Sequence, residues 1–535
     1  MKKWLAVLMT MLLMLSACTA KQDSSASPEK GKEAKKILNL NNGNEPTSFD
    51  PPIGFDGVSW NALNNLGEGL TRLGKDHQPE PAAAEKWDVS SDGKVYTFHL
   101  RKNAKWSNGK PVTAEDFEYA WKRMLSAELA SPAAFLAYFI EGAEAYNTGK
   151  GSADDVKVKA VDENTFEVTL TSPQAFFLSV ITNPSFFPVS KDVVENNADW
   201  AKEAATFVGN GPFKLTKWEH SKEMVFEKNE HYWDAKSVKL DGVKWAMIND
   251  SNTEYQMYQT NELDSSSVPS ALAEKLIEDG KVKMEDQAGL EFYRFNVNME
   301  PFQNQKIREA FSLAIDQEKI AKYVKRQGQK AAYGMVSYGF EDASGQDFRK
   351  HNGDLIKTDT AKAKQLLEEG MKEEGYKALP EVTLTYSTSD GNKMVAEALQ
   401  QMINEALGVD IKIANMEWNV FSEDQKAGKF QFSRGSFLAD YGDPVNFLEN
   451  FTTGNIMNRT AWSNAQYDEL IKKSKQEKEE KQRFEYLYQA EQLLLKELPV
   501  VPLYFYAQTY LQKDNITGVV HHPVGYLELK WADKK

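Results

Sequence analysis

Short stretches of alternating apolar and polar residues dominate the chain between residue 37 and about residue 264. One pair of such stretches flanks Asp92 and Gly93, and a second pair, over 156–170, flanks the turn at 162–164. A further stretch opens after Gly211 and runs to Phe226. A period of two is typical of half-buried strands, and Asp-Gly and Asn-containing turns favour hairpins. The pattern therefore predicts antiparallel β structure through this part of the chain.

The spacing of apolar residues changes after Phe292. Ile307, Ala310, Phe311 and Ala314 follow at the 3.6-residue spacing of a helix. Residues 382–386 then alternate, 395–406 carry a helical stripe, and 411–413 alternate again. This order predicts a β-α-β unit with parallel strands, and ligands bind at the carboxyl ends of such strands. The change near Phe292 predicts a second lobe.

The first 36 residues have the pattern of an exported lipoprotein. Lys2 and Lys3 precede an apolar run that is too short for a spanning helix, and the run ends in Leu-Ser-Ala before Cys18. We expect a signal peptide over 1–17, a lipid on Cys18, and a flexible tether over 18–36, which is rich in Ser, Lys, Glu and Ala. Cys18 is the only cysteine in the sequence, so no disulfide can form within the chain. The predicted location is the extracytoplasmic face of a cell membrane.

Length and charge narrow the class of protein further. A chain of 535 residues exceeds the size of a single core, so two or three domains are expected. The net charge of −14 disfavours nucleic-acid binding, which depends on neutralising phosphates. The seven histidines form no His-Glu-x-x-His pair, and the sequence has no Gly-x-Ser-x-Gly elbow and no glycine-rich phosphate loop. An enzyme, a cofactor and a metal site are therefore not expected, although paired catalytic carboxylates cannot be recognised from sequence alone.

A candidate binding segment lies at 432–441, where Arg434 and Asp440 are separated by apolar and small residues. In an extended segment the two side chains would share a face, with their Cα atoms roughly 20 Å apart. Charges removed from water need a partner, and a free peptide offers both an ammonium and a carboxylate. The alternative is that each charge is solvated or paired with another side chain of the protein.

Several blocks of sequence resemble the peptide-binding lipoproteins of oligopeptide and dipeptide ABC importers, which are solute-binding proteins of family 5. The most specific block, at 103–117, reads Asn-Ala-Lys-Trp-Ser-Asn-Gly-Lys-Pro-Val-Thr-Ala-Glu-Asp-Phe. Further blocks lie at 83–87, 209–213, 229–233, 262–264, 307–310 and 501–504. The likeness covers nearly the whole mature chain and is greatest to the oligopeptide-type branch, which includes dipeptide and murein-peptide binders of Gram-positive bacteria.

The resemblance implies an α/β fold with two lobes that close on a ligand, the periplasmic-binding-protein or Venus flytrap fold, with an extra inserted subdomain. It implies one lobe over 37–67, 190–290 and 507–535, an inserted subdomain over 68–189, and a second lobe over 291–506. The partners implied are a short peptide and the permease subunits of the importer, and a monomer is expected.

The resemblance also assigns ligand-binding residues. It implies that Asp440 takes the peptide ammonium, that Arg434 takes a carboxylate, and that the backbone at Ser436 and Leu438 pairs with the peptide as a strand. Further residues implied to line the site are Asp56, Val58, Trp418, Phe437 and Tyr506. Asn392 stands where some relatives have histidine, and Gln425 stands where an arginine is found, so the peptide length is left open.

Other functions fit parts of this pattern. They are an extracytoplasmic hydrolase, a receptor of the same fold for nickel, haem or sugar, and a signalling or scaffold protein, since a fold does not fix a function. The separated charges of Arg434 and Asp440 favour a zwitterionic peptide over these alternatives.

Overall fold

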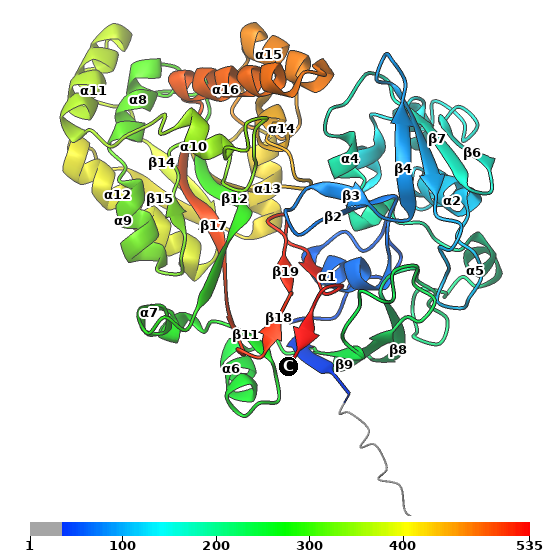
Figure 1. Cartoon of the computed structure of the whole chain (residues 1–535). Helices are drawn as coiled ribbons and strands as arrows, with labels where there is room; N and C mark the ends of the chain where they lie inside the picture. Colours follow the sequence, from blue (N-terminus) through cyan, green and yellow to red (C-terminus); the bar gives the residue numbers. More distant parts are fainter. Residues whose placement is uncertain (1–34) are drawn as a thin grey trace, which may run out of the picture. The chain divides into compact units, whose positions relative to one another are not determined.

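A computed structural model describes residues 35–535, of which 36–535 form one compact unit. The predicted signal peptide, the predicted lipidation site at Cys18 and nearly all of the predicted tether lie outside the described residues. The unit is built on three main sheets with helices packed around them (Figure 1).

The first sheet has four strands in the order β1 (Ile37–Asn41), β10 (Gly242–Ala246), β9 (Glu223–Lys228) and β8 (Phe213–Glu219). Strand β1 pairs in parallel with β10, although the two strands are far apart in sequence. Helix α1 (Gly57–Leu66) contacts this sheet through β8. Asp56 caps α1 by accepting a hydrogen bond from the backbone N–H of Ser59 at 2.8 Å.

The second sheet confirms the two hairpins predicted from alternating residues. Its strands, in order, are β4 (Ala84–Val89), β5 (Val95–Leu100), β7 (Thr165–Thr169) and β6 (Val158–Asp162). Helix α2 (Ala114–Met124) covers this sheet with Phe117 and Trp121, which are fully buried. A small hairpin of β2 (Thr71–Leu73) and β3 (Pro79–Pro81) precedes it.

The third sheet contains the predicted β-α-β unit. Its strands run in the order β11 (Ser265–Ser267), β17 (Val500–Gln512), β12 (Lys283–Phe295), β16 (Phe432–Leu438), β14 (Thr383–Ser387) and β15 (Lys412–Met416), and β13 (Lys330–Ala331) also pairs with β17. Strands β14 and β15 are parallel, and α12 (Asp390–Leu407) connects them. Strands β12 and β17 are 13 residues long and pair along most of their length.

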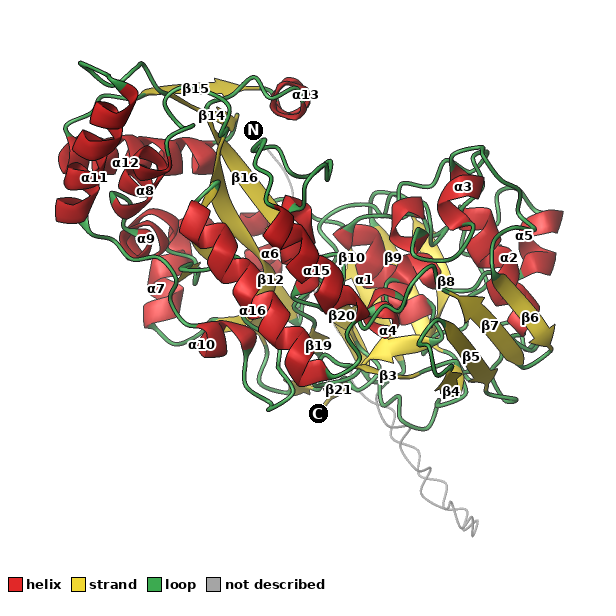
Figure 2. Ribbon diagram, turned by 90° about the horizontal axis from the view of Figure 1, so that it is seen from above, coloured by secondary structure: helices red, strands yellow, loops and turns green. Residues whose placement is uncertain are grey.

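Helices enclose the third sheet, and α15 (Ala465–Gln476) lies beside α16 (Glu480–Glu497) in Figure 2. The third sheet and the second sheet lie at opposite ends of the unit in both views. The remaining helices are α3 (Ala143–Asn147), α4 (Phe177–Val180), α5 (Lys191–Asn196), α6 (Ser251–Gln259), α7 (Ala273–Glu278), α8 (Gln305–Leu313), α9 (Gln317–Lys319), α10 (Phe348–Asn352), α11 (Thr360–Glu374), α13 (Trp418–Lys426) and α14 (Val445–Leu448). Short turns of other helix types span Ala134–Ala137, Pro184–Phe186, Ser270–Leu272, Ile320–Lys325 and Glu449–Phe451. The C-terminal segment adds two small pairs, β18 (Ile516–Thr517) with β21 (Asp533–Lys534) and β19 (Val520–His521) with β20 (Leu527–Glu528).

Candidate functional site

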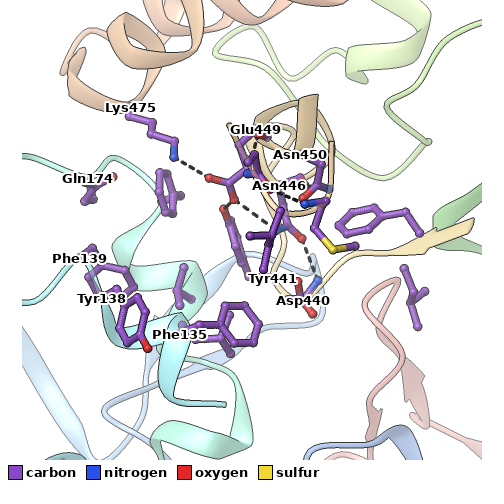
Figure 3. A pocket seen from close by; sticks show the side chains of 18 of the residues that line it. Phe135, Tyr138, Phe139, Gln174, Asp440, Tyr441, Asn446, Glu449, Asn450 and Lys475 are labelled. Carbon is purple, nitrogen blue, oxygen red and sulfur yellow. Dashed lines mark hydrogen bonds and ion pairs between the residues drawn. The ribbon is translucent and has the colours of Figure 1, made fainter. Parts of the chain in front are cut away.

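A cavity of about 740 Å³ lies between two parts of the chain, 135–180 and 436–475. Figure 3 shows side chains from both parts pointing into it. The lining residues are Phe135, Leu136, Tyr138, Phe139, Gln174, Phe176, Val180, Ser436, Phe437, Leu438, Asp440, Tyr441, Asn446, Glu449, Asn450, Asn455, Ile456, Met457, Lys475 and Tyr506. The volume is in the range of sites that enclose a small ligand.

Asp440 lines the cavity just beyond Leu438, where β16 ends, so the extended conformation expected over 432–441 stops before Asp440. The Asp440 backbone N–H donates to Asn446 Oδ1 at 2.8 Å, and its carbonyl accepts from Asn183 Nδ2 at 3.3 Å. The following turn is fixed by a buried ion pair between Asp443 and Arg483, with 2.5 Å between Arg483 Nη2 and the carboxylate. These contacts hold Asp440 in place through its backbone.

The Asp440 carboxylate has no cationic side chain within 4.0 Å among residues 35–535. Burial raises its pKa to about 6, and the nearby Glu449 carboxylate contributes in the same direction. Glu449 itself is compensated, because it accepts from Tyr441 Oη at 2.6 Å and pairs with Lys475 Nζ at 2.5 Å. Asp440 is therefore an acidic group at the cavity wall whose carboxylate has no cationic partner in the described part of the chain.

Aromatic rings from residues 135–180 form the opposite wall. Phe135 is half exposed, and Phe176 stacks on Tyr441 with 5.2 Å between ring centroids. The sequence pattern did not predict this wall. A possible signal was the concentration of aromatic residues at Phe135, Tyr138 and Phe139, which the pattern alone would assign to a core.

Strand β16 offers a free edge next to the cavity. One edge pairs with β12 from Phe432 to Leu438. The other edge pairs with β14 at Phe432 and Ser433 alone, so residues 434–438 have no second strand partner in the described part of the chain. Ser436, Phe437 and Leu438 lie on this free segment and line the cavity. The arrangement can accept an added strand through the backbone.

Arg434 already has a partner within the protein. Its Nε lies 2.5 Å from Glu291 Oε1, and its Nη2 donates to Glu291 Oε2 at 2.8 Å. Burial alone would lower the Arg434 pKa, but the neighbouring Glu291 carboxylate outweighs this effect and raises the pKa. For Arg434 the structure therefore favours the alternative that the charge is paired with another side chain of the protein, and its contact with a peptide carboxylate stays a prediction. Glu291 stands in the apolar run Leu290–Phe292, and a charge in such a run indicates a buried ion pair.

The structure brings together five of the candidate ligand-binding residues at the cavity: Ser436, Phe437, Leu438, Asp440 and Tyr506. Tyr506 Oη also donates to Glu291 Oε2 at 2.8 Å, which links the cavity to the Arg434 pair.

The other candidates lie outside the cavity lining. Trp418 is 53% exposed at the start of α13, and Gln425 is buried in the same helix. Asn392 Nδ2 donates to the Ser387 carbonyl at 2.8 Å. Asp56 caps α1, and the Val58 carbonyl accepts from Asn42 Nδ2 at 3.1 Å.

Residues 35–535 contain no group of three or more His, Cys, Asp or Glu side chains arranged to hold a metal ion. No helix in this part of the chain is both long enough and apolar enough to cross a membrane.

Residues 78–459 match the family described as bacterial extracellular solute-binding proteins, family 5. The dipeptide-binding protein DppE of Bacillus subtilis is 60% identical over 523 residues, covering 97% of this chain and 96% of that protein. The oligopeptide-binding protein OppA of the same organism is 39% identical and covers 97% of both chains.

Solved structures resemble the whole described unit. The unliganded open form of the murein tripeptide-binding protein MppA gives a TM-score of 0.81 at 30% identity, over 94% of this chain and 97% of that one. OppA of Listeria monocytogenes bound to peptide gives a TM-score of 0.74 at 30% identity, over 94% and 100% of the two chains. These likenesses confirm the predicted two-lobed α/β fold.

Proposed function

The chain belongs to family 5 of the bacterial extracellular solute-binding proteins, and from this we propose that it is the peptide-capturing receptor of an ABC importer. It binds dipeptides or short oligopeptides between two lobes and delivers them to the membrane permease. Peptides released from the cell wall are included in this class, since a relative of the same fold is named a murein tripeptide-binding protein.

The observation that carries the proposal is the uncompensated carboxylate of Asp440 at the wall of a cavity that aromatic side chains line on the opposite side. A peptide ammonium placed against Asp440 would supply the missing cation. A charge-assisted hydrogen bond in a partly dry site is stronger than one in water. The adjacent free edge of β16 would then pair with the peptide backbone, and such pairing does not depend on the side chains of the peptide.

We propose that closure completes the site. One lobe comprises residues 37–67, 190–290 and 507–535, and the second lobe comprises 291–506. Residues 68–189 form an inserted subdomain. Asp56 and Val58 would then meet a ligand held at Asp440 when the lobes approach each other, and Trp418, Asn392 and Gln425 would contact longer peptides. A higher TM-score to an unliganded open form than to a peptide-bound relative supports an open arrangement here.

We further propose that a lipid on Cys18 holds the receptor, as a monomer, on the extracytoplasmic face of the membrane. The relatives are named as binding proteins, which favours a receptor over a hydrolase. Incubation of the purified protein with a peptide library separates these two functions. A receptor leaves every peptide intact, whereas a hydrolase produces fragments.

Isothermal titration calorimetry with Ala-Ala-Ala tests the proposal directly. Saturable binding with one site per chain is the expected result. Absence of binding across a set of di-, tri- and tetrapeptides contradicts the proposal.

A further inference from the structure

Arg294 on β12 is a buried cation that has no carboxylate partner within residues 35–535, although its guanidinium lies 4.6 Å from the centre of the Phe292 ring. It is 5% exposed, and its Nη1 reaches two uncharged acceptors, Gln425 Oε1 and the Arg434 carbonyl, both at the long distance of 3.4 Å. Its Nε has no hydrogen-bond partner. Burial, together with the Arg459 and Arg434 cations, lowers the Arg294 pKa to about 9. Burying a guanidinium without a carboxylate beside it is costly, because its charge is not compensated.

Arg459 shares the same uncharged acceptor. Its Nη1 donates to Gln425 Oε1 at 2.9 Å, and no carboxylate lies within 4.0 Å of it among residues 35–535. The Nε of Arg459 is likewise buried and unpaired. Gln425 uses its Nε2 to donate to Ser433 Oγ and to the Arg434 carbonyl, which fixes its oxygen toward the two arginines. Two guanidinium groups therefore converge on one neutral amide.

The Glu291 carboxylate does not balance the charge of Arg294 or Arg459, because it is already paired with Arg434. Glu291 makes two contacts with Arg434 and accepts from Tyr506. The group of three arginines thus has one carboxylate. This leaves a net positive charge at Arg294 and Arg459.

Arg294 is close to the ligand cavity. It lines a small adjoining void of about 10 Å³ whose other walls include Phe437, Asn450 and Met457, and these three residues also line the main cavity. The Arg294 guanidinium packs against the backbone at Gly435. A Cβ on residue 435 would collide with Arg294 Nη1, so glycine is needed there. Gly435 belongs to the free edge of β16, along which the peptide is proposed to bind.

We propose that Arg294 and Arg459 accept a carboxylate of the bound peptide, an inference that rests on the proposed function. Gly435 lies on β16 and Asp440 just beyond its end, so their Cα atoms are at most roughly 16 Å apart. A peptide of about three residues spans roughly 10 Å, and a hydrogen bond of about 3 Å at each end fills the remainder. The carboxylate comes from the C-terminus or from an acidic side chain near it, and both sources present the same chemistry to a guanidinium fork.

Calorimetry with four peptides tests the inference and distinguishes the sources. Ala-Ala-Ala is compared with its C-terminal amide, and Ala-Ala-Glu amide with Ala-Ala-Gln amide. Removing the recognised carboxylate should weaken binding to the wild-type protein at least tenfold in one of the two pairs. In Arg294→Gln, the same pair should differ less than threefold, and in Arg326→Gln, a change of an exposed arginine, the difference should remain as in wild type.

Gln425→Glu provides a second variant if Arg294→Gln does not fold. It places a carboxylate of the protein between the two arginines, so it should also abolish the preference for the charged peptide. Equal binding of charged and uncharged peptides by the wild-type protein overturns the inference and leaves the proposed function standing. Equal weakening of all four peptides in the variants overturns it too, because that result indicates a purely structural role. If no peptide binds to the wild-type protein, both the proposed function and this inference fail.

Discussion

Replacing Asp440 by asparagine should weaken the binding of a peptide with a free amino group while stabilising the unliganded protein. Asparagine keeps the shape and the hydrogen bond toward Asn446 but removes the negative charge. A hydrogen bond to a charged group contributes about 1.5–3 kcal/mol, so the dissociation constant of Ala-Ala-Ala should rise roughly 10- to 150-fold. N-acetyl-Ala-Ala-Ala has no ammonium, so its weaker binding should be the same in both proteins.

The gain in stability follows from the pKa of Asp440. The folded protein raises this pKa from 3.8 to about 6, so the ionised form is disfavoured on folding. The cost is absent below pH 3.8, grows as the pH rises through the interval up to about 6, and is constant above it. At about 1.4 kcal/mol per pKa unit, the full cost is at most about 3 kcal/mol. About half of that remains at pH 5.

Urea denaturation at pH 7.5 and pH 5 measures this effect in wild type and Asp440→Asn. The variant should be more stable at both values, with the larger gain at pH 7.5. Asp154→Asn, which changes an exposed aspartate, is the matched control and should alter neither stability nor binding. Wild-type affinity for Ala-Ala-Ala should also fall below about pH 6, whereas the variant should show no such dependence. A variant that binds Ala-Ala-Ala as tightly as wild type would refute the role of Asp440.

Three further predictions concern the ion pair, the anchor and closure. Glu291→Gln should destabilise the protein by about 3–5 kcal/mol in urea denaturation, because it leaves Arg434 buried without a counter-charge. The double variant Glu291→Gln with Arg434→Gln should recover part of that loss. A loss below about 1 kcal/mol in the single variant would contradict the reasoning. Cys18→Ser should release the protein into the culture medium with unchanged peptide affinity, as measured by fractionation and calorimetry, whereas retention in washed membranes would argue against a lipid anchor. Saturating Ala-Ala-Ala should reduce the radius of gyration in small-angle scattering and raise the melting temperature with the logarithm of ligand concentration; tight binding with neither change would exclude closure.

The sequence predicted most of the local structure because strong periodicity dictates it. The hairpins around Asp92 and Asn164 and the β-α-β unit over 382–416 are present as expected. Helix α6 was not predicted, and the segment was assigned to strands. Its buried side is the polar residue Glu254, so it has no apolar stripe to reveal it.

The candidate site was predictable in part. Asp440 was singled out because a charge in an apolar run is unusual, whereas Ser436, Phe437 and Leu438 were named only through the resemblance to peptide-binding lipoproteins. The partner of Arg434 was not found, because Glu291 is distant in sequence and lies beside it through the pairing of β12 with β16. The aromatic wall at Phe135 and Tyr138 was missed for a similar reason, since its place depends on how residues 68–189 pack against the second half of the chain.

Native mass spectrometry of the purified protein offered a mixture of tripeptides tests the central claim most directly. The mixture contains each peptide with a free amino terminus and the same peptide acetylated. The account predicts that one peptide is retained per chain and that the retained peptides carry free amino groups. Retention of acetylated and free peptides in equal amounts, or of none, would contradict it.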